Sequence, residues 1–199
     1  GLCLVGSEMC IRDSRKGAIE TMFDSFVPLN RSPYFHKQKD GSLRHETQVA
    51  ADRAIDFLDR AKNEAEPFCL SISFNASHAE DRDKKDHFPY PKVVGSLYEG
   101  VKMPAPRLAD PEVFNSQPEF LRKSMNRDIF FWRWDTEEKY QNNMRNYLRM
   151  ISGIDHAIGR VIDELKSKGM DKNTVIIYMA GNGYYAASRG FAGKWSHYE

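Results

Sequence analysis

Cysteine is scarce in this chain, and long apolar runs are missing from it. The 199 residues include three cysteines, Cys3, Cys10 and Cys69, and their spacing predicts no disulfide framework. No apolar run approaches the roughly 20 residues that a membrane-spanning helix needs. An excess of positive charge is missing as well, since the formal net charge is +1. That balance gives no electrostatic reason to expect nucleic acid. We therefore expect no membrane span and no nucleic-acid partner.

A hydrophobic content of 41% over 199 residues is typical of a globular domain with a real core. Residues 1–14 are the exception. They lack the basic start, long apolar centre and small-residue cleavage site of a signal peptide, and they resemble a translated sequencing-adapter string. We expect residues 1–14 to be a non-native leader outside the fold, so that the native start and any export signal are missing.

Hydrophobic periodicity predicts two helices and two strands in the remainder. Apolar residues at three- and four-residue spacing indicate a helix that is capped by Thr47 and reaches Ala61. A capping box at 135–138 opens a second, longer helix that stops at Gly169. The runs 68–74 and 174–179 read as strands, the second apolar throughout, as buried parallel strands are. The pattern predicts an α/β fold with a mostly parallel sheet flanked by helices.

Three residues in these elements invite a packing prediction. Gly153 and Gly159 each cost the long helix about 1 kcal/mol against alanine. Close packing of this helix on the sheet is the expected compensation. Cys69 lies within the first strand, where we expect it to be a small buried hydrophobe.

The segment from His78 to Asp135 is polar and interrupted by prolines. Long loops in compact domains are usually functional or disordered. Because aromatic residues are scattered through this segment, we expect an ordered insertion that lies over the sheet edge and stays outside the core.

Polar residues follow both predicted strands, at the edge where open α/β sheets bind ligands. His78 comes shortly after the first strand, Asn182 stands between two glycines after the second, and Lys194 follows Gly193. Each has an ordinary alternative role. A loop histidine often bonds a neighbouring carbonyl, Asn and Gly favour tight turns, and a lone lysine is usually solvated.

Taken together, Phe-Asn-Ala-Ser-His78, the helix with Gly153-Ile-Asp155, Gly181-Asn182-Gly183 and Gly193-Lys194-Trp195 resemble the sulfatase family of the alkaline-phosphatase superfamily. The resemblance implies an alkaline-phosphatase-like fold and hydrolysis of sulfate esters, with sulfated carbohydrate as the expected substrate.

The same resemblance implies roles for four residues. His78 and Lys194 are the candidate catalytic residues that contact the sulfate ester, and Asn182 is a candidate calcium ligand. Arg189 stands where other members carry His and is the candidate substrate-binding residue.

Two departures from the family pattern limit what this chain can do. Gly181 stands where the family has Asp, which weakens the implied Ca²⁺ site. The paired Asp-Asp and the Cys-x-Pro-Ser-Arg or Ser-x-Pro-Ser-Arg segment, source of the formylglycine nucleophile, are absent. We therefore expect residues 15–199 to be a partial sulfatase catalytic domain that is inactive alone.

Two other functions stay open. A phosphodiesterase or phosphonate hydrolase of the same superfamily would need a metal site richer in His and Asp, and this sequence shows no such cluster. A pseudoenzyme that binds sulfated glycan without hydrolysing it is supported by Gly181. Only the family suggests a location, which is periplasmic or secreted.

Overall fold

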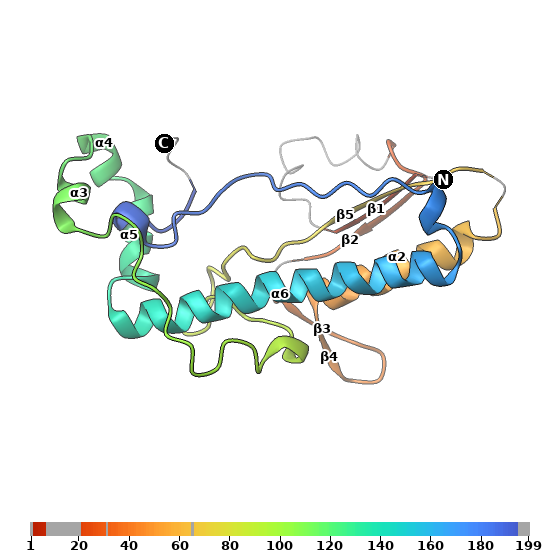
Figure 1. Ribbon diagram of the computed structural model, residues 1–199, viewed down its shortest axis with the longest axis horizontal. Coiled ribbons are helices and arrows are strands. Elements are labelled where there is room, and N and C mark those ends of the chain that lie inside the picture. Colours follow the sequence, from red (N-terminus) through yellow and green to blue (C-terminus); the bar gives the residue numbers. More distant parts are fainter. Residues whose placement is uncertain (1, 7–20, 31, 65, 195–199) are drawn as a thin grey trace.

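The computed structural model describes residues 2–6, 21–30, 32–64 and 66–194. The molecule is elongated, with the helix α6 (Glu137–Ser167) running along much of its length beneath a small sheet (Figure 1). None of the helices in these ranges has a stretch long and apolar enough to cross a membrane.

The sheet is parallel, and its three strands stand in the order β2-β1-β5. Their bounds are Leu2–Gly6 for β1, Ser25–Pro28 for β2 and Cys69–Ser73 for β5. Val5 of β1 lies opposite Val27 on one side and Ile72 on the other. A separate antiparallel pair, β3 (Phe35–Lys37) and β4 (Leu43–His45), was not expected. The predicted α/β class and the strand at β5 are confirmed.

Strand β1 comes from the segment that we expected to lie outside the fold. Residues 2–6 form the central strand, paired on both sides through their backbone. Backbone pairing of this kind depends little on which side chains the strand carries. The non-native origin of residues 1–14 accordingly stays a prediction.

Helix α2 (Glu46–Ala61) follows β4 without a gap. Its cap is His45 and not Thr47: the His45 ring accepts a hydrogen bond from the Thr47 amide through Nδ1, and Nε2 donates to the Pro89 carbonyl. Burial lowers the pKa of His45 to about 4, so the ring is neutral and free to accept at Nδ1. The helix therefore starts one residue before Thr47.

Helix α6 begins after Thr136, whose hydroxyl accepts from the Lys139 amide. The capping box placed that role on Asp135, which instead pairs with the Lys139 ammonium at 2.6 Å. At the other end Gly169 has φ +69°, a left-handed conformation that suits glycine after a helix. The predicted end of the helix is confirmed.

The predicted strand over 174–179 is wrong for this structure. Residues 174–180 form no strand, and the segment is drawn as coil in Figure 1. Val175 is 86% exposed and Met179 is 80% exposed. A parallel strand needs a hydrogen-bonded neighbour, and none of the described strands pairs with this segment. Cys69 was also expected to be buried, and it is exposed at the start of β5.

Two hydrophobic clusters form the core, and α6 contributes to both. One joins α2 and the C-terminal half of α6 to side chains of the β2 and β5 region, including Val27, Leu70 and Ile72. The other gathers around Phe88, Trp134 and Met150 at the opposite end of α6.

The segment 78–135 packs along α6 and supplies Phe88, Met103 and Ile129 to the core. Its elements are η2 (Lys92–Val94), α3 (Pro111–Asn115), α4 (Glu119–Arg122) and α5 (Met125–Arg133). The described residues also include two short turns, η3 (Asp171–Asn173) and η4 (Ser188–Gly190). We expected this segment to lie outside the core, and that was wrong, because some of its large apolar side chains, among them Phe88 and Trp134, are buried against α6.

The two glycines of α6 have different surroundings. A Cβ on Gly153 would lie 2.6 Å from Cγ of Pro91, whereas a Cβ on Gly159 would meet nothing within 4 Å. Gly153 thus allows close approach of the 86–95 segment and not of the sheet. Gly159 has no packing reason in the described residues.

The two glycines therefore make a matched pair for a stability measurement. Gly153→Ala should lower the free energy of unfolding by about 1–3 kcal/mol, because the methyl group collides with a proline ring. Gly159→Ala should raise it by up to about 1 kcal/mol through helix propensity. Urea unfolding measures both, and equal effects of the two substitutions would contradict the packing at Pro91.

Candidate functional site

His78 lies in a turn that follows β5. Its backbone amide donates to the Asn75 carbonyl at 2.9 Å, and its ring Nδ1 donates to the Ala79 carbonyl at 2.9 Å. A carbonyl can only accept, so the bond fixes a proton on Nδ1 and orients the ring. His78 thus makes the bond to a neighbouring carbonyl that is common for a loop histidine.

Two buried side chains hold this turn from the α2 side. The Tyr34 hydroxyl donates to the carbonyls of Asn75 and His78, at 3.1 and 2.6 Å. Oε1 of Glu46 accepts from the backbone amide and the side-chain amide of Asn75, each at 3.1 Å. Since the Glu46 amide donates to the Tyr34 carbonyl at 2.8 Å, the start of α2, Tyr34 and the His78 turn form one network.

Glu46 is fully buried, and no cation among the described residues pairs with it, which is unusual for a buried carboxyl group. Burial raises its pKa to about 7, and the hydrogen bonds from Asn75 and Ala76 offset only part of that effect. Within the described residues, Oε2 of Glu46 and Oδ1 of Asn75 have no hydrogen-bond partner. A proton on Oε2 of Glu46 would turn this acceptor into a donor, which is consistent with the raised pKa of Glu46.

Lys194 is placed by Asn126 of α5. The fully buried Asn126 side chain accepts from the amides of Ala192 and Gly193 through Oδ1, at 3.0 and 2.5 Å. The Gly193 carbonyl in turn accepts from the Tyr185 amide at 2.9 Å. The backbone on the N-terminal side of Lys194 is thereby fixed against α5, and the Lys194 side chain is half-buried.

The His78 turn and the loop before Lys194 lie at the same end of the molecule. Buried Arg133 of α5 bridges them: its guanidinium pairs with Asp81 and donates to the Tyr184 hydroxyl at 3.3 Å. Ala79 and Ala192 belong to one hydrophobic cluster. In Figure 1 the chain leaving β5 and the η4 turn both reach the end that carries α5.

The other two predicted site residues are Asn182 and Arg189, and Arg189 lies in the η4 turn. Asn182 is exposed, and its side-chain amide donates to the adjacent Gly183 carbonyl at 2.6 Å. Arg189 has a left-handed backbone, with φ +57°, and its amide donates to the Arg107 carbonyl at 3.4 Å.

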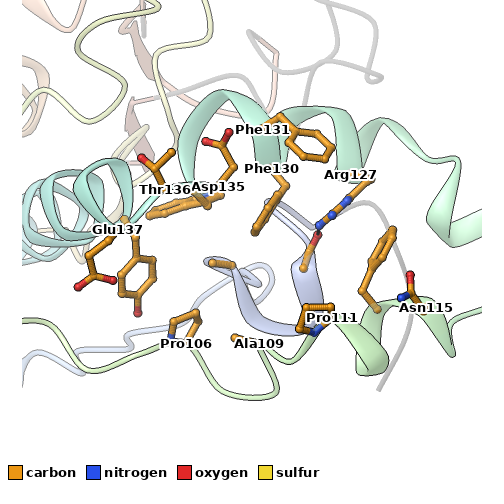
Figure 2. Close-up of a pocket in the computed structure, with 15 residues that line it drawn as sticks. Pro106, Ala109, Pro111, Asn115, Arg127, Phe130, Phe131, Asp135, Thr136 and Glu137 are labelled. Atoms are coloured by element: carbon orange, nitrogen blue, oxygen red, sulfur yellow. Dashed lines mark hydrogen bonds between the residues drawn. The ribbon is translucent and has the colours of Figure 1, made fainter.

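A cavity of about 440 Å³ lies beside the η4 turn. Figure 2 shows Arg127 and Phe130 of α5 pointing into it, while Asp135 and Glu137 stand on the side away from Arg127. Nearly half of the residues that line it are aromatic or proline.

The family model for sulfatases matches residues 13–199, nearly the whole chain. The chain belongs to the sulfatase family. It is 26% identical to N-acetylglucosamine-6-O-sulfatase of Bacteroides thetaiotaomicron, over 77% of this chain and 36% of that protein. It is also 26% identical to choline-sulfatase of Rhizobium meliloti and 24% identical to iduronate 2-sulfatase of Mus musculus. These two alignments cover 79% and 75% of this chain, and 30% and 28% of the relatives.

A solved structure supports the fold. Phosphonate monoester hydrolase from Silicibacter pomeroyi superposes with a TM-score of 0.71 at 18% identity, covering 98% of this chain and 47% of that one. The match confirms the alkaline-phosphatase-like fold of the superfamily. The chain spans about a third of the length of the curated sulfatases that it matches.

Sulfatases generally use Ca²⁺, and the described residues do not fit such a site. They contain no group of three or more His, Cys, Asp or Glu that could hold a metal ion. Asn182 is exposed and stands next to Gly181, which has no side chain to offer. An Asp at position 181 would meet no steric obstacle, because a Cβ there has nothing within 4 Å.

The residues that hold the two loops were not predicted from the sequence. Glu46 stands just before the predicted cap Thr47, and Asn126 and Arg133 lie in a segment that we expected to be outside the core. Asn75 belongs to the motif Phe-Asn-Ala-Ser-His78, and its closeness to His78 in the sequence was the one indication of its role. Arg127 gave none.

Glu46→Gln tests the buried carboxyl. A pKa raised in the folded state means that Glu46 stabilises the fold fully below pH 4.5, and that this contribution is lost as the pH rises through 7. The neutral glutamine should therefore be more stable than the parent chain at high pH. Between pH 5.5 and 8.5 its advantage should grow by about 2 kcal/mol, measured by urea unfolding. Exposed Glu138, in the first turn of α6, is the control, and an equal pH effect of Glu138→Gln would contradict the role of burial.

Proposed function

We propose that this chain is part of a hydrolase that cleaves sulfate esters of carbohydrate. The observation that carries the proposal is the shared end of the molecule reached by the His78 turn and the Gly193–Lys194 loop, both held there by buried polar side chains. Two of the relatives are named for sulfated sugars, N-acetylglucosamine 6-sulfate and iduronate 2-sulfate, which favours a saccharide substrate.

The two candidate catalytic residues have complementary roles. His78 is oriented by its bond to the Ala79 carbonyl, and in its cationic form Nε2 carries a second proton. That proton can pass to the alkoxide that leaves the sulfur. The Lys194 ammonium stabilises the negative charge that develops on the ester oxygens in the transition state. Arg189, on the same loop, is the proposed contact to a substrate anion.

The nucleophile and the metal are outside what this chain supplies. Sulfatases generally use a formylglycine, made from the first residue of a Cys- or Ser-x-Pro-Ser-Arg segment, and this sequence contains no such segment. We propose that formylglycine and most of the calcium ligands belong to other parts of a longer protein. The 199-residue chain alone should then not turn over a sulfate ester.

A second candidate function is binding of sulfated glycan without hydrolysis. The observation that favours it is Gly181, since packing does not forbid an Asp at that position and the chain carries none. Such a protein would keep the substrate contacts and lose affinity for the metal.

Lys194→Ala in the longer protein tests the hydrolase. Loss of one oriented donor costs about 3 kcal/mol in the transition state, so kcat/KM on a sulfated saccharide should fall by about a hundredfold. Release of inorganic sulfate is the readout, and circular dichroism checks that the fold is kept. The matched control is Lys172→Ala, which removes an exposed lysine of η3 and should leave the rate unchanged.

Two outcomes would decide against hydrolysis at this site. Unchanged kcat/KM in the Lys194 variant would remove Lys194 from the reaction. Tight binding of the saccharide by the parent protein, with no sulfate released in the presence of calcium, would favour the glycan-binding function instead.

A further inference from the structure

The cavity beside η4 contains a cation, Arg127, that pairs with no acid among the described residues. Arg127 donates one hydrogen bond to the Gly190 carbonyl, from Nη1 at 2.8 Å, and no described carboxylate pairs with it. Its guanidinium lies over the rings of Phe114, Phe130 and Phe131, at 3.9, 4.5 and 4.6 Å from their centroids. Burial among these rings lowers the pKa of Arg127, so the charge is less well solvated than a surface arginine's.

The acids of the same cavity are already partnered. Asp135 pairs with the Lys139 ammonium at 2.6 Å, and Glu137 accepts from the Gln141 side chain at 3.0 Å. Both also lie on the side of the cavity away from Arg127 (Figure 2). Glu137 keeps its negative charge, because the Gln141 amide is neutral, but that charge lies on the other side of the cavity. The positive charge on the Arg127 side is therefore locally unbalanced, and an anion near Arg127 would pair with it.

The volume and the lining of the cavity indicate which kind of molecule carries that anionic group. A volume of about 440 Å³ falls within the roughly 300–1,000 Å³ of small-molecule sites, and those sites are lined mainly by apolar and aromatic groups with a few polar ones. Phe131 lines the cavity and is 49% exposed, which leaves ring surface for a ligand. A pyranose ring offers an apolar C–H face to such a wall and carries its charged substituents at the edge.

The cavity also adjoins the proposed sulfate-binding loop. Gly190, the residue that Arg127 holds, is four residues before Lys194, so their Cα atoms are at most ~14 Å apart. A disaccharide can span such a separation.

We propose that this cavity is an anion subsite for the sugar adjacent to the one that carries the reacting sulfate. Arg127 binds the sulfate or carboxylate group of that second sugar, and Phe131 packs against its ring. The inference rests on the proposed function, and it makes the substrate a saccharide with anionic groups on neighbouring rings.

Binding of matched disaccharides to the 199-residue chain tests the subsite. Three probes share one sulfated ring, and their second ring carries either no charge, a sulfate or a carboxylate. The parent chain should bind the two doubly charged probes about tenfold more tightly than the singly charged one, by calorimetry or NMR titration. A preference for only one of the doubly charged probes identifies whether the subsite takes sulfate or carboxylate.

Arg127→Gln should abolish this preference while leaving the affinity for the singly charged probe unchanged. Arg122→Gln is the control, because Arg122 is an exposed arginine on the neighbouring α4 and outside the cavity. Arg127→Lys keeps the charge and should retain part of the preference, even if Arg127→Gln unfolds the η4 turn.

The comparison of probes on the parent chain needs no variant. Equal affinity for all three probes, or a preference that persists in Arg127→Gln, would overturn the subsite. Lys194→Ala separates this result from the proposed function: it should weaken all three probes alike, and its failure to do so would count against the sulfate site and not against Arg127.

Discussion

Helix α6 is buried along both halves by different partners. Its N-terminal half packs in the cluster around Phe88 and Trp134, and its C-terminal half packs with α2 against the β2 and β5 region. Fully burying one large apolar side chain contributes about 1.5–3 kcal/mol, so a 31-residue amphipathic helix is worth far more in packing than in its own propensity. Because both clusters share this helix, α6 sets the spacing between the sheet and the end that carries η4.

Buried polar side chains hold the two loops that the packing of the helices does not fix. The His78 turn and the loop before Lys194 have no regular hydrogen-bonded ladder, and their backbone groups bond to Tyr34, Glu46 and Asn126. Removing such a partner leaves a buried group unsatisfied, which costs about 1–3 kcal/mol. The position of each loop is therefore tied to a specific side chain on α2, on α5 or at Tyr34 just before β3, and a loss of that side chain should move the loop before it unfolds the domain.

The sequence predicted the structural features that depend mainly on residues close together in the chain. The end of α6 at Gly169 was predictable, because only a left-handed residue fits there. The absence of a strand over 174–179 was not predictable. The apolar pattern of this segment suits a buried strand, but the pattern cannot tell whether a partner strand lies beside it. The cap of α2 went to His45 because a neutral buried ring can accept from the Thr47 amide. For the site, sequence motifs named His78 and Lys194, whose roles stay predictions. They could not name Glu46 or Asn126, because only folding brings those side chains to the loops.

A structure of the chain with inorganic sulfate tests most directly whether His78 and Lys194 serve one anion. We expect a single sulfate with oxygens about 3 Å from both the His78 imidazole and the Lys194 ammonium. A sulfate bound by one of the two residues alone, or the two side chains on opposite faces of the sheet, would contradict a shared sulfate-binding edge.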